Sequence, residues 1–165
     1  RDLVRSRGLG DVYKRQGEKY SPEGMEEAIV DKSPFIDQII IYNNQSPFTG
    51  AIVVPNRDAL RRELDARDIR EGRAAAAADI LGAEIDRYRA GGPYAGEFPE
   101  RWLPAGLAIV DEPFTEQNGL INSTMKIVRN KVEEYFRDRI DYLYTPEGRE
   151  LRNDKNLASL RKMVE

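Results

Sequence analysis

The chain has 165 residues, enough for one domain with a modest hydrophobic core. Its 26 Lys and Arg against 29 Asp and Glu give a net charge of −3, without the basic excess of nucleic-acid-binding domains. No apolar run approaches the roughly 18 residues of a membrane span, and the basic residues 1–16 lack the apolar stretch of a secretory signal. We therefore expect a cytoplasmic protein that binds no nucleic acid and contacts a membrane at most peripherally.

The sequence contains neither Cys nor His. Without Cys there are no disulfides, thiolate nucleophiles or cysteine metal sites, and without His there is no Ser–His triad. Any catalysis must use Lys, Arg, carboxylates, Tyr, hydroxyls or backbone amides. This favours electrostatic stabilisation of an anionic transition state, and we predict no metal site in this chain.

The first half of the chain predicts two strands between helices. Ser21, Pro22 and Glu23 are typical of a helix start, and the helix is expected to end at Ser33-Pro34. The β-branched stretches 35–42 and 48–54 predict a hairpin closed by the polar turn 43–47.

Two further helices and a third strand are predicted along the rest of the chain. Asn56 can cap a helix over Arg57–Ala66, and a second helix follows over Arg73–Arg89. A proline-rich loop leads to a short strand over 107–110, and a long helix is expected from Ser123 to Tyr144.

The elements together predict an α+β fold, a small sheet of about three strands, including a hairpin, packed by three to four helices. Residues 1–16 have no helical or strand period, and we expect a non-native or disordered leader there. The folded domain is expected over 17–145, followed by a polar C-terminal tail over 146–165.

One lysine, Lys126, stands out within the segment Asn122–Arg129. Asn, Ser and Thr at positions 122–124 favour helix caps, so Lys126 is expected close to the positive end of a helix dipole. Free backbone N–H groups beside an ammonium would bind a carboxylate or a phosphate. From these residues alone, a solvated surface lysine is the simpler interpretation.

Three segments resemble motifs of one family, in the family's order. The segment Phe114–Lys126 resembles the pattern F-T-x-x-N-G-L-x-x-T-x-K, with one more residue between Leu120 and Thr124, and Gly50–Asn56 resembles G-A-L-x-V-P-N. Upstream, Gly17–Ala28 resembles G-E-x-V/Y-x-P-x-x-I/L-E-E-A. Together they resemble the C-terminal lid domain of AMP-forming long-chain acyl-coenzyme A synthetases, in the adenylate-forming enzyme superfamily.

The resemblance implies a two-step ligase that activates a fatty acid. ATP and the acid form an acyl-adenylate, and coenzyme A then displaces AMP. The lid would swing over an N-terminal adenylation domain that this chain lacks, where Mg²⁺ is expected. Lys126 would be the catalytic residue of the first step, Gly17 and Glu18 would face pantetheine, and Arg129 would support an anion. The isolated chain is predicted to be inactive.

Several alternatives remain open at the level of sequence. A solvated or carboxylate-paired Arg129 is the simpler interpretation of that residue, and Glu26 and Glu27 are expected to be surface charges. The family's hinge motif is missing before Gly17, where residues 1–16 resemble translated adaptor sequence. The alternative function is a stand-alone, non-catalytic α+β interaction domain.

Overall fold

A single sheet of three strands organises the structure, a computed structural model that describes residues 21–165. Strands β1 (Ile36–Tyr42), β2 (Gly50–Pro55) and β3 (Gly106–Ile109) lie in the order β1-β2-β3. β1 and β2 form an antiparallel hairpin, whereas β2 and β3 are parallel. The predicted α+β fold, with a small sheet that includes a hairpin, is confirmed.

The parallel pairing of β2 and β3 requires a long crossover between them. The crossover contains α2 (Arg57–Ala66), α3 (Arg73–Asp86) and the short 3₁₀ turn η1 (Glu100–Trp102). The Asn56 side chain caps α2 by accepting the Ala59 N–H at 2.8 Å, as its position predicted. α3 is three residues shorter than expected.

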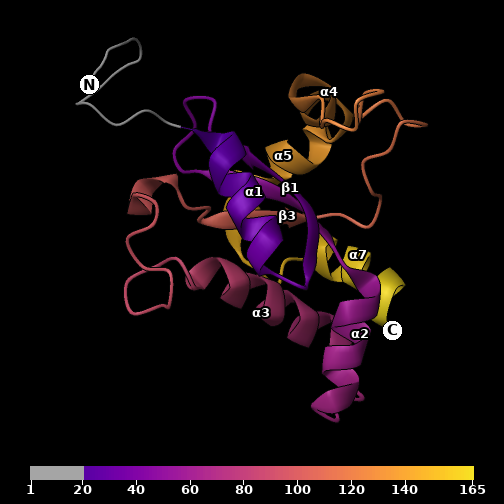
Figure 1. The fold of residues 1–165 in the computed structure, drawn as a ribbon. Coiled ribbons are helices and arrows are strands. Elements are labelled where there is room, and N and C mark those ends of the chain that lie inside the picture. The colour runs from indigo at the N-terminus through magenta and orange to yellow at the C-terminus, as the bar shows by residue number, and fades with distance from the viewer. Residues whose placement is uncertain (1–20) are drawn as a thin grey trace.

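Side chains that alternate along the strands bury both faces of the sheet. One face, which includes Ile39, Val53 and Ile109, packs against α2, α3, α7 (Asp154–Val164) and α1 (Pro22–Lys32). The other, which includes Ile40, Ile52 and Ala108, packs against α4 (Arg129–Tyr135), α5 (Arg137–Leu143) and the preceding loop. Figure 1 shows α1 lying across the strands and α4 and α5 toward the top of the molecule. Because both faces are covered, each strand is an almost continuous apolar run.

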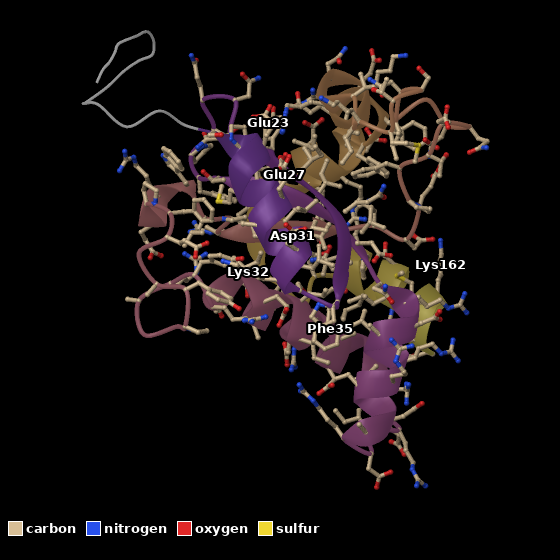
Figure 2. The ribbon with its side chains drawn as sticks, in the orientation of Figure 1. Glu23, Glu27, Asp31, Lys32, Phe35 and Lys162 are labelled. Carbon is tan, nitrogen blue, oxygen red and sulfur yellow. The ribbon has the colours of Figure 1, made fainter. Side chains whose placement is uncertain are left out.

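Helix α1 (Pro22–Lys32) has one buried and one acidic side. Met25, Glu26 and Ile29 are buried. Glu23, Glu27 and Asp31 are exposed and follow one another along the outer side of the helix in Figure 2. This spacing of four residues places all three carboxylates on one exposed stripe.

The prediction of a single helix over 123–144 is wrong. Residues 122–126 form a turn, and the helical region consists of α4 (Arg129–Tyr135) and α5 (Arg137–Leu143), which meet at Phe136. Phe136 has φ −104° and ψ 27°, outside the helical region. Capping-type residues at 122–124 start a turn here instead of a helix, because Asn side chains also bond to nearby backbone in turns.

Residues 146–165, expected as a polar tail, form α6 (Pro146–Arg149) and α7 (Asp154–Val164). The buried residues of α7 repeat at helical spacing and complete the core beside α3; they are Asn156, Ser159, Leu160, Met163 and Val164. Two of the five are polar, which hid the amphipathic pattern in the sequence. Within residues 21–165, no helix is long and apolar enough to cross a membrane.

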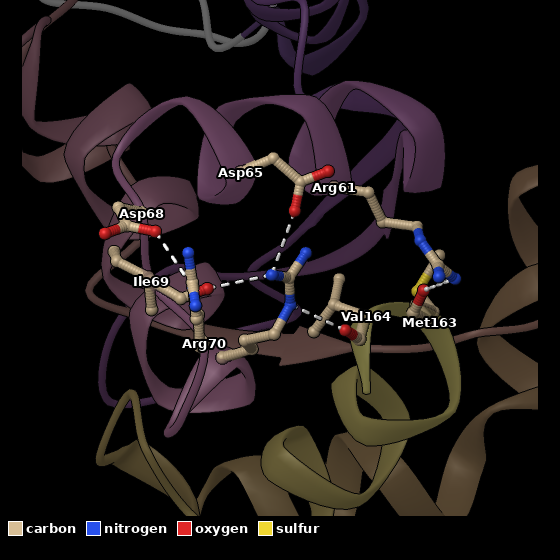
Figure 3. Close-up of polar contacts among 8 residues, drawn as sticks. Arg61, Asp65, Asp68, Ile69, Arg70, Met163 and Val164 are labelled. Atoms are coloured by element: carbon tan, nitrogen blue, oxygen red, sulfur yellow. Dashed lines mark hydrogen bonds and ion pairs between the residues drawn. The ribbon is translucent and has the colours of Figure 1, made fainter.

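Arginines from the crossover helices hold the end of α7 (Figure 3). Arg61 donates to the Met163 carbonyl at 3.3 Å, and Arg73 donates to the Val164 carbonyl at 2.9 Å. Cations at the C-terminal end of a helix satisfy its last carbonyls and complement its dipole. α7 is therefore tied to α2 and α3 by polar as well as apolar contacts.

Candidate functional site

The segment Phe114–Leu120 forms a closed turn that leads toward Lys126. Thr115 N–H donates to Asn118 Oδ1 at 2.9 Å, and Asn118 N–H donates to Thr115 Oγ1 at 3.1 Å. Gly119 has φ +80°, a conformation that favours glycine, and Phe114 is buried. Each of these residues of the motif has a structural role in shaping the chain before the lysine.

Lys126 lies at the end of a tight hairpin loop. The loop is closed where Asn122 N–H donates to the Lys126 carbonyl at 2.9 Å, and Ile121 pairs with Ile127 in an isolated antiparallel bridge. Val128 N–H donates to the Leu120 carbonyl at 2.8 Å and continues the pairing. The lysine is therefore held by a small ladder of backbone bonds.

A single side-chain oxygen organises the inside of this loop. Asn122 Oδ1 accepts the Thr124 N–H at 3.0 Å, the Thr124 hydroxyl at 2.7 Å and the Lys126 N–H at 3.0 Å. Met125 has φ +66° and is 68% exposed. These hydrogen bonds order the loop, and Met125 and Lys126 are both exposed on its surface.

The expected helix-dipole environment of Lys126 is wrong. α4 begins at Arg129, three positions after the lysine, and the Lys126 N–H is bonded to Asn122. The anion site inferred from free helical N–H groups is therefore not present at Lys126. What the loop does provide is an exposed ammonium that makes no ion pair within residues 21–165.

Arg129 is bonded to the protein through both terminal nitrogens. Nη1 donates to the Ile41 carbonyl at 3.0 Å, and Nη2 donates to Glu26 Oε1 at 2.7 Å. Glu23 lies 3.7 Å from the same Nη2. The carboxylate-paired alternative for Arg129 is the one that the structure contains.

Glu26, expected at the surface, is only 8% exposed. Its other oxygen, Oε2, accepts the Ile41 N–H at 2.6 Å. Burial raises the pKa of Glu26 above its ordinary value, because loss of hydration outweighs the hydrogen bonds from Arg129 and Ile41. Glu27, by contrast, is exposed as expected.

An open groove of about 550 Å³ runs between α1, β1 and the loop of residues 122–126, called the lysine loop. Its apolar lining comes from Val30, Ile39, Ile40, Met125 and Ile127. Its charged lining comprises Glu23, Glu26, Glu27, Asp31, Asp37, Lys126 and Arg129. Since Arg129 is neutralised by Glu26, Lys126 is the cation of this groove that remains available to an external anion. No cluster of three or more potential metal-ligating side chains occurs in the described part of the chain.

A family model described as the AMP-binding enzyme C-terminal domain matches residues 12–78. This segment, which is less than half of the chain, is similar to that family. The matched range covers α1, the β1–β2 hairpin, α2 and the start of α3, and it begins within residues 1–16. Gly17 and Glu18 fall in the match but lie outside the described residues.

Relatives of this C-terminal domain are adenylate-forming enzymes. The chain is 26% identical to long chain acyl-CoA synthetase 8 of Arabidopsis thaliana, over 81% of this chain and 19% of the relative. It is 28% identical to a chloroplastic long-chain-fatty-acid–acyl-carrier-protein ligase of the same plant, over 87% of this chain and 18% of the relative. The chain thus spans about a fifth of the length of these curated relatives.

A solved structure of similar fold is the A domain of carboxylic acid reductase from Segniliparus rugosus, in complex with AMP and a co-purified carboxylic acid. The two are 26% identical with a TM-score of 0.54, over 78% of this chain and 18% of that one. The relatives therefore include coenzyme A ligases, carrier-protein ligases and reductases.

Two residues of the site were missed by sequence reasoning. The sequence predicts a helix cap at Asn122, although Asn followed by Ser and Thr equally favours a side-chain turn. Glu26 lies one turn before Ile29 and Val30, on the apolar side of α1, which was the available signal for its burial.

Proposed function

We propose that this chain is the C-terminal lid of an AMP-forming acyl-coenzyme A synthetase that activates a fatty acid. The observation that carries the proposal is Lys126, exposed at the closing end of an ordered loop within a motif that resembles the family's lysine motif. Its partner would be an N-terminal adenylation domain, with fatty acid, ATP and coenzyme A as substrates and Mg²⁺ bound by that domain. The reductase relative, solved with AMP and a carboxylic acid, supports chemistry between a carboxylate and a nucleotide.

Lys126 would act by electrostatics. When the acid's carboxylate attacks the α-phosphate, negative oxygens gather at one point, and an ammonium beside them lowers the free energy of the transition state. The Asn122 bonds hold the Lys126 backbone before the substrates arrive, so little ordering remains to be done during the reaction. Lysine suits this role because its charge is compact and lies on a long stem.

The second half-reaction would use a different pose of the lid. We propose that Gly17 and Glu18 then lie beside the pantetheine arm of coenzyme A while Lys126 has left the adenylate. Coenzyme A is proposed as the acceptor because the 17–28 and 50–56 segments resemble those of acyl-coenzyme A synthetases. The isolated chain should form no acyl-coenzyme A, since one lysine cannot supply the proximity of two substrates.

The test is Lys126→Ala in the intact protein that includes the N-terminal domain. ATP–pyrophosphate exchange should fall by roughly a hundred- to a thousandfold, the typical effect of losing one preorganised charge or donor. Thioester formation from supplied acyl-adenylate and coenzyme A should be largely retained. Lys131→Ala, an exposed lysine on α4, is the matched control and should leave both steps normal.

Normal exchange in Lys126→Ala, or an equal loss in both half-reactions, would refute the role proposed for Lys126. Acyl-coenzyme A formation by the isolated chain would refute the lid assignment itself. The two measurements thus address different parts of the proposal.

A further inference from the structure

We infer that Arg129 and Glu26 form a clamp that positions Lys126, and that Arg129 contributes to adenylation only through that lysine. The inference rests on the proposed function of Lys126. It assigns to Arg129 a positioning role in place of anion binding.

The clamp joins three segments that are distant in sequence. Arg129 opens α4, Glu26 lies in the middle of α1, and Ile41 lies on β1, at the edge of the sheet. Arg129 donates to the Ile41 carbonyl and to Glu26, while Glu26 accepts the Ile41 N–H. Both backbone groups of Ile41 are thereby satisfied by side chains where a further strand would otherwise pair.

The same clamp determines where the base of the lysine loop lies. Arg129 directly follows Val128, whose N–H closes the ladder to Leu120, and Ile127 pairs with Ile121 just beyond. The bonds from Asn122 shape the loop internally, but they connect it only to itself. Within residues 21–165, the polar contacts of segment 121–129 with α1 and β1 are those of Arg129. The Gln38 side chain of β1 bonds to the Phe114 backbone, seven residues before that segment.

Arg129 is poorly placed to hold a ligand itself. Its side chain is 28% exposed, its two terminal nitrogens bond to Ile41 and Glu26, and Glu23 adds negative charge nearby. An incoming phosphate would have to displace the carboxylate of Glu26, which is itself buried. A displacement of Lys126 by about 1 Å, on the other hand, would be enough to lower the rate about a hundredfold.

The kinetic test is a double-mutant cycle in the intact enzyme. Arg129→Met should lower kcat of ATP–pyrophosphate exchange by about 10- to 100-fold, within the effect of a misplaced catalytic group, with little change in KM for ATP. Thioester formation from supplied acyl-adenylate should be unchanged. In a Lys126→Ala background, Arg129→Met should cause no further loss of exchange, and Arg129→Lys should recover part of the wild-type rate.

Arg152→Met is the matched control, because Arg152, in the loop before α7, pairs with Asp79 of α3 at an exposed position. It should leave both half-reactions normal. An equal fold-loss from Arg129→Met with and without Lys126 would overturn the inference, because Arg129 would then act independently of the lysine.

A second measurement on the 165-residue chain separates this inference from the proposed function. A lysine-specific protease can cleave the Lys126–Ile127 bond, and its rate there relative to the Lys155–Asn156 bond reports local order of the loop. Arg129→Met and Glu26→Gln should each raise this ratio several-fold, and Arg152→Met should not. An unchanged ratio would refute the clamp even if Lys126 is essential. Normal exchange in Lys126→Ala would instead refute the proposed function, and the catalytic part of this inference with it.

Discussion

Replacing Asn156 with Ala should strongly destabilise the domain. Asn156 lies on α7, is fully buried and makes four hydrogen bonds to other segments. Its Oδ1 accepts the Ile109 N–H at 2.8 Å and Arg139 Nη2 at 2.7 Å. Its Nδ2 donates to the carbonyls of Leu107 at 2.9 Å and Leu151 at 3.0 Å. One side chain thus joins α7 to β3 and α5.

The expected loss follows from the partners that would be left without a bond. Ile109 N–H and the Leu107 carbonyl lie on the buried edge strand β3, and each unsatisfied buried group costs about 1–3 kcal/mol. Loss of the bond to Arg139 should add to the destabilisation, because burial already lowers the pKa of Arg139 and its Nε lacks a partner within the described residues. We expect a total loss of roughly 3–5 kcal/mol from these groups, a large part of the roughly 5–15 kcal/mol that stabilises a typical domain.

Urea denaturation of the chain, followed by circular dichroism, would measure the change in the unfolding midpoint at constant slope. Asn156→Asp retains the two acceptor bonds but turns its second oxygen toward the Leu107 and Leu151 carbonyls, so it should also destabilise the domain. Asn130→Ala, an exposed residue on α4, is the control and should change stability by less than about 0.5 kcal/mol. A loss below about 1 kcal/mol for Asn156→Ala, less than one unsatisfied group typically costs, would refute the reasoning.

Three further predictions concern pH and packing. The raised pKa of Glu26 means that the folded chain holds the carboxyl proton to a higher pH than the unfolded chain. The stability of the wild-type chain, compared with that of Glu26→Gln, should therefore fall as pH rises from 4.5 through the raised pKa. A rise in this relative stability across that window, measured by denaturation at each pH, would contradict the prediction. Burial raises the pKa of Tyr88 to about 12, so its contribution should be complete below pH 10 and lost as pH rises from 10 to 12. Tyr88→Phe should remove this loss, and identical alkaline melting curves for the two proteins would count against it. A Cβ on Gly148 would lie 1.7 Å from the Tyr142 carbonyl oxygen, so Gly148→Ala should cost at least about 1–3 kcal/mol, whereas Gly24→Ala, whose nearest contact is 3.4 Å away, should be tolerated in thermal melts.

Residue patterns over a few positions were sufficient to predict the helices and strands whose formation depends on residues close in sequence. Asn56 before an amphipathic stretch predicted the start of α2, and two β-branched stretches around a polar turn predicted the β1–β2 hairpin. Capping, turn chemistry and side-chain alternation act over a few residues, so they can be recognised in the sequence alone. The motif around Lys126 likewise indicated a resemblance to adenylate-forming enzymes, because a motif is recognised from the order of its residues in the sequence.

Only the tertiary structure decided the environment of that lysine and the extent of the domain. Glu26 and Arg129 are separated by 103 positions, so no local pattern could pair them or predict that Glu26 is buried. α4 starts at Arg129 and not at Ser123, because the Asn122 side chain and the Ile121–Ile127 bridge bond to backbone groups that would otherwise form the first turn of a helix. α7 joined the core because β3 supplies partners for the buried Asn156, whose polarity had suggested a solvated tail. A polar residue is buried when distant groups satisfy its hydrogen bonds, and those groups are known only once the chain has folded.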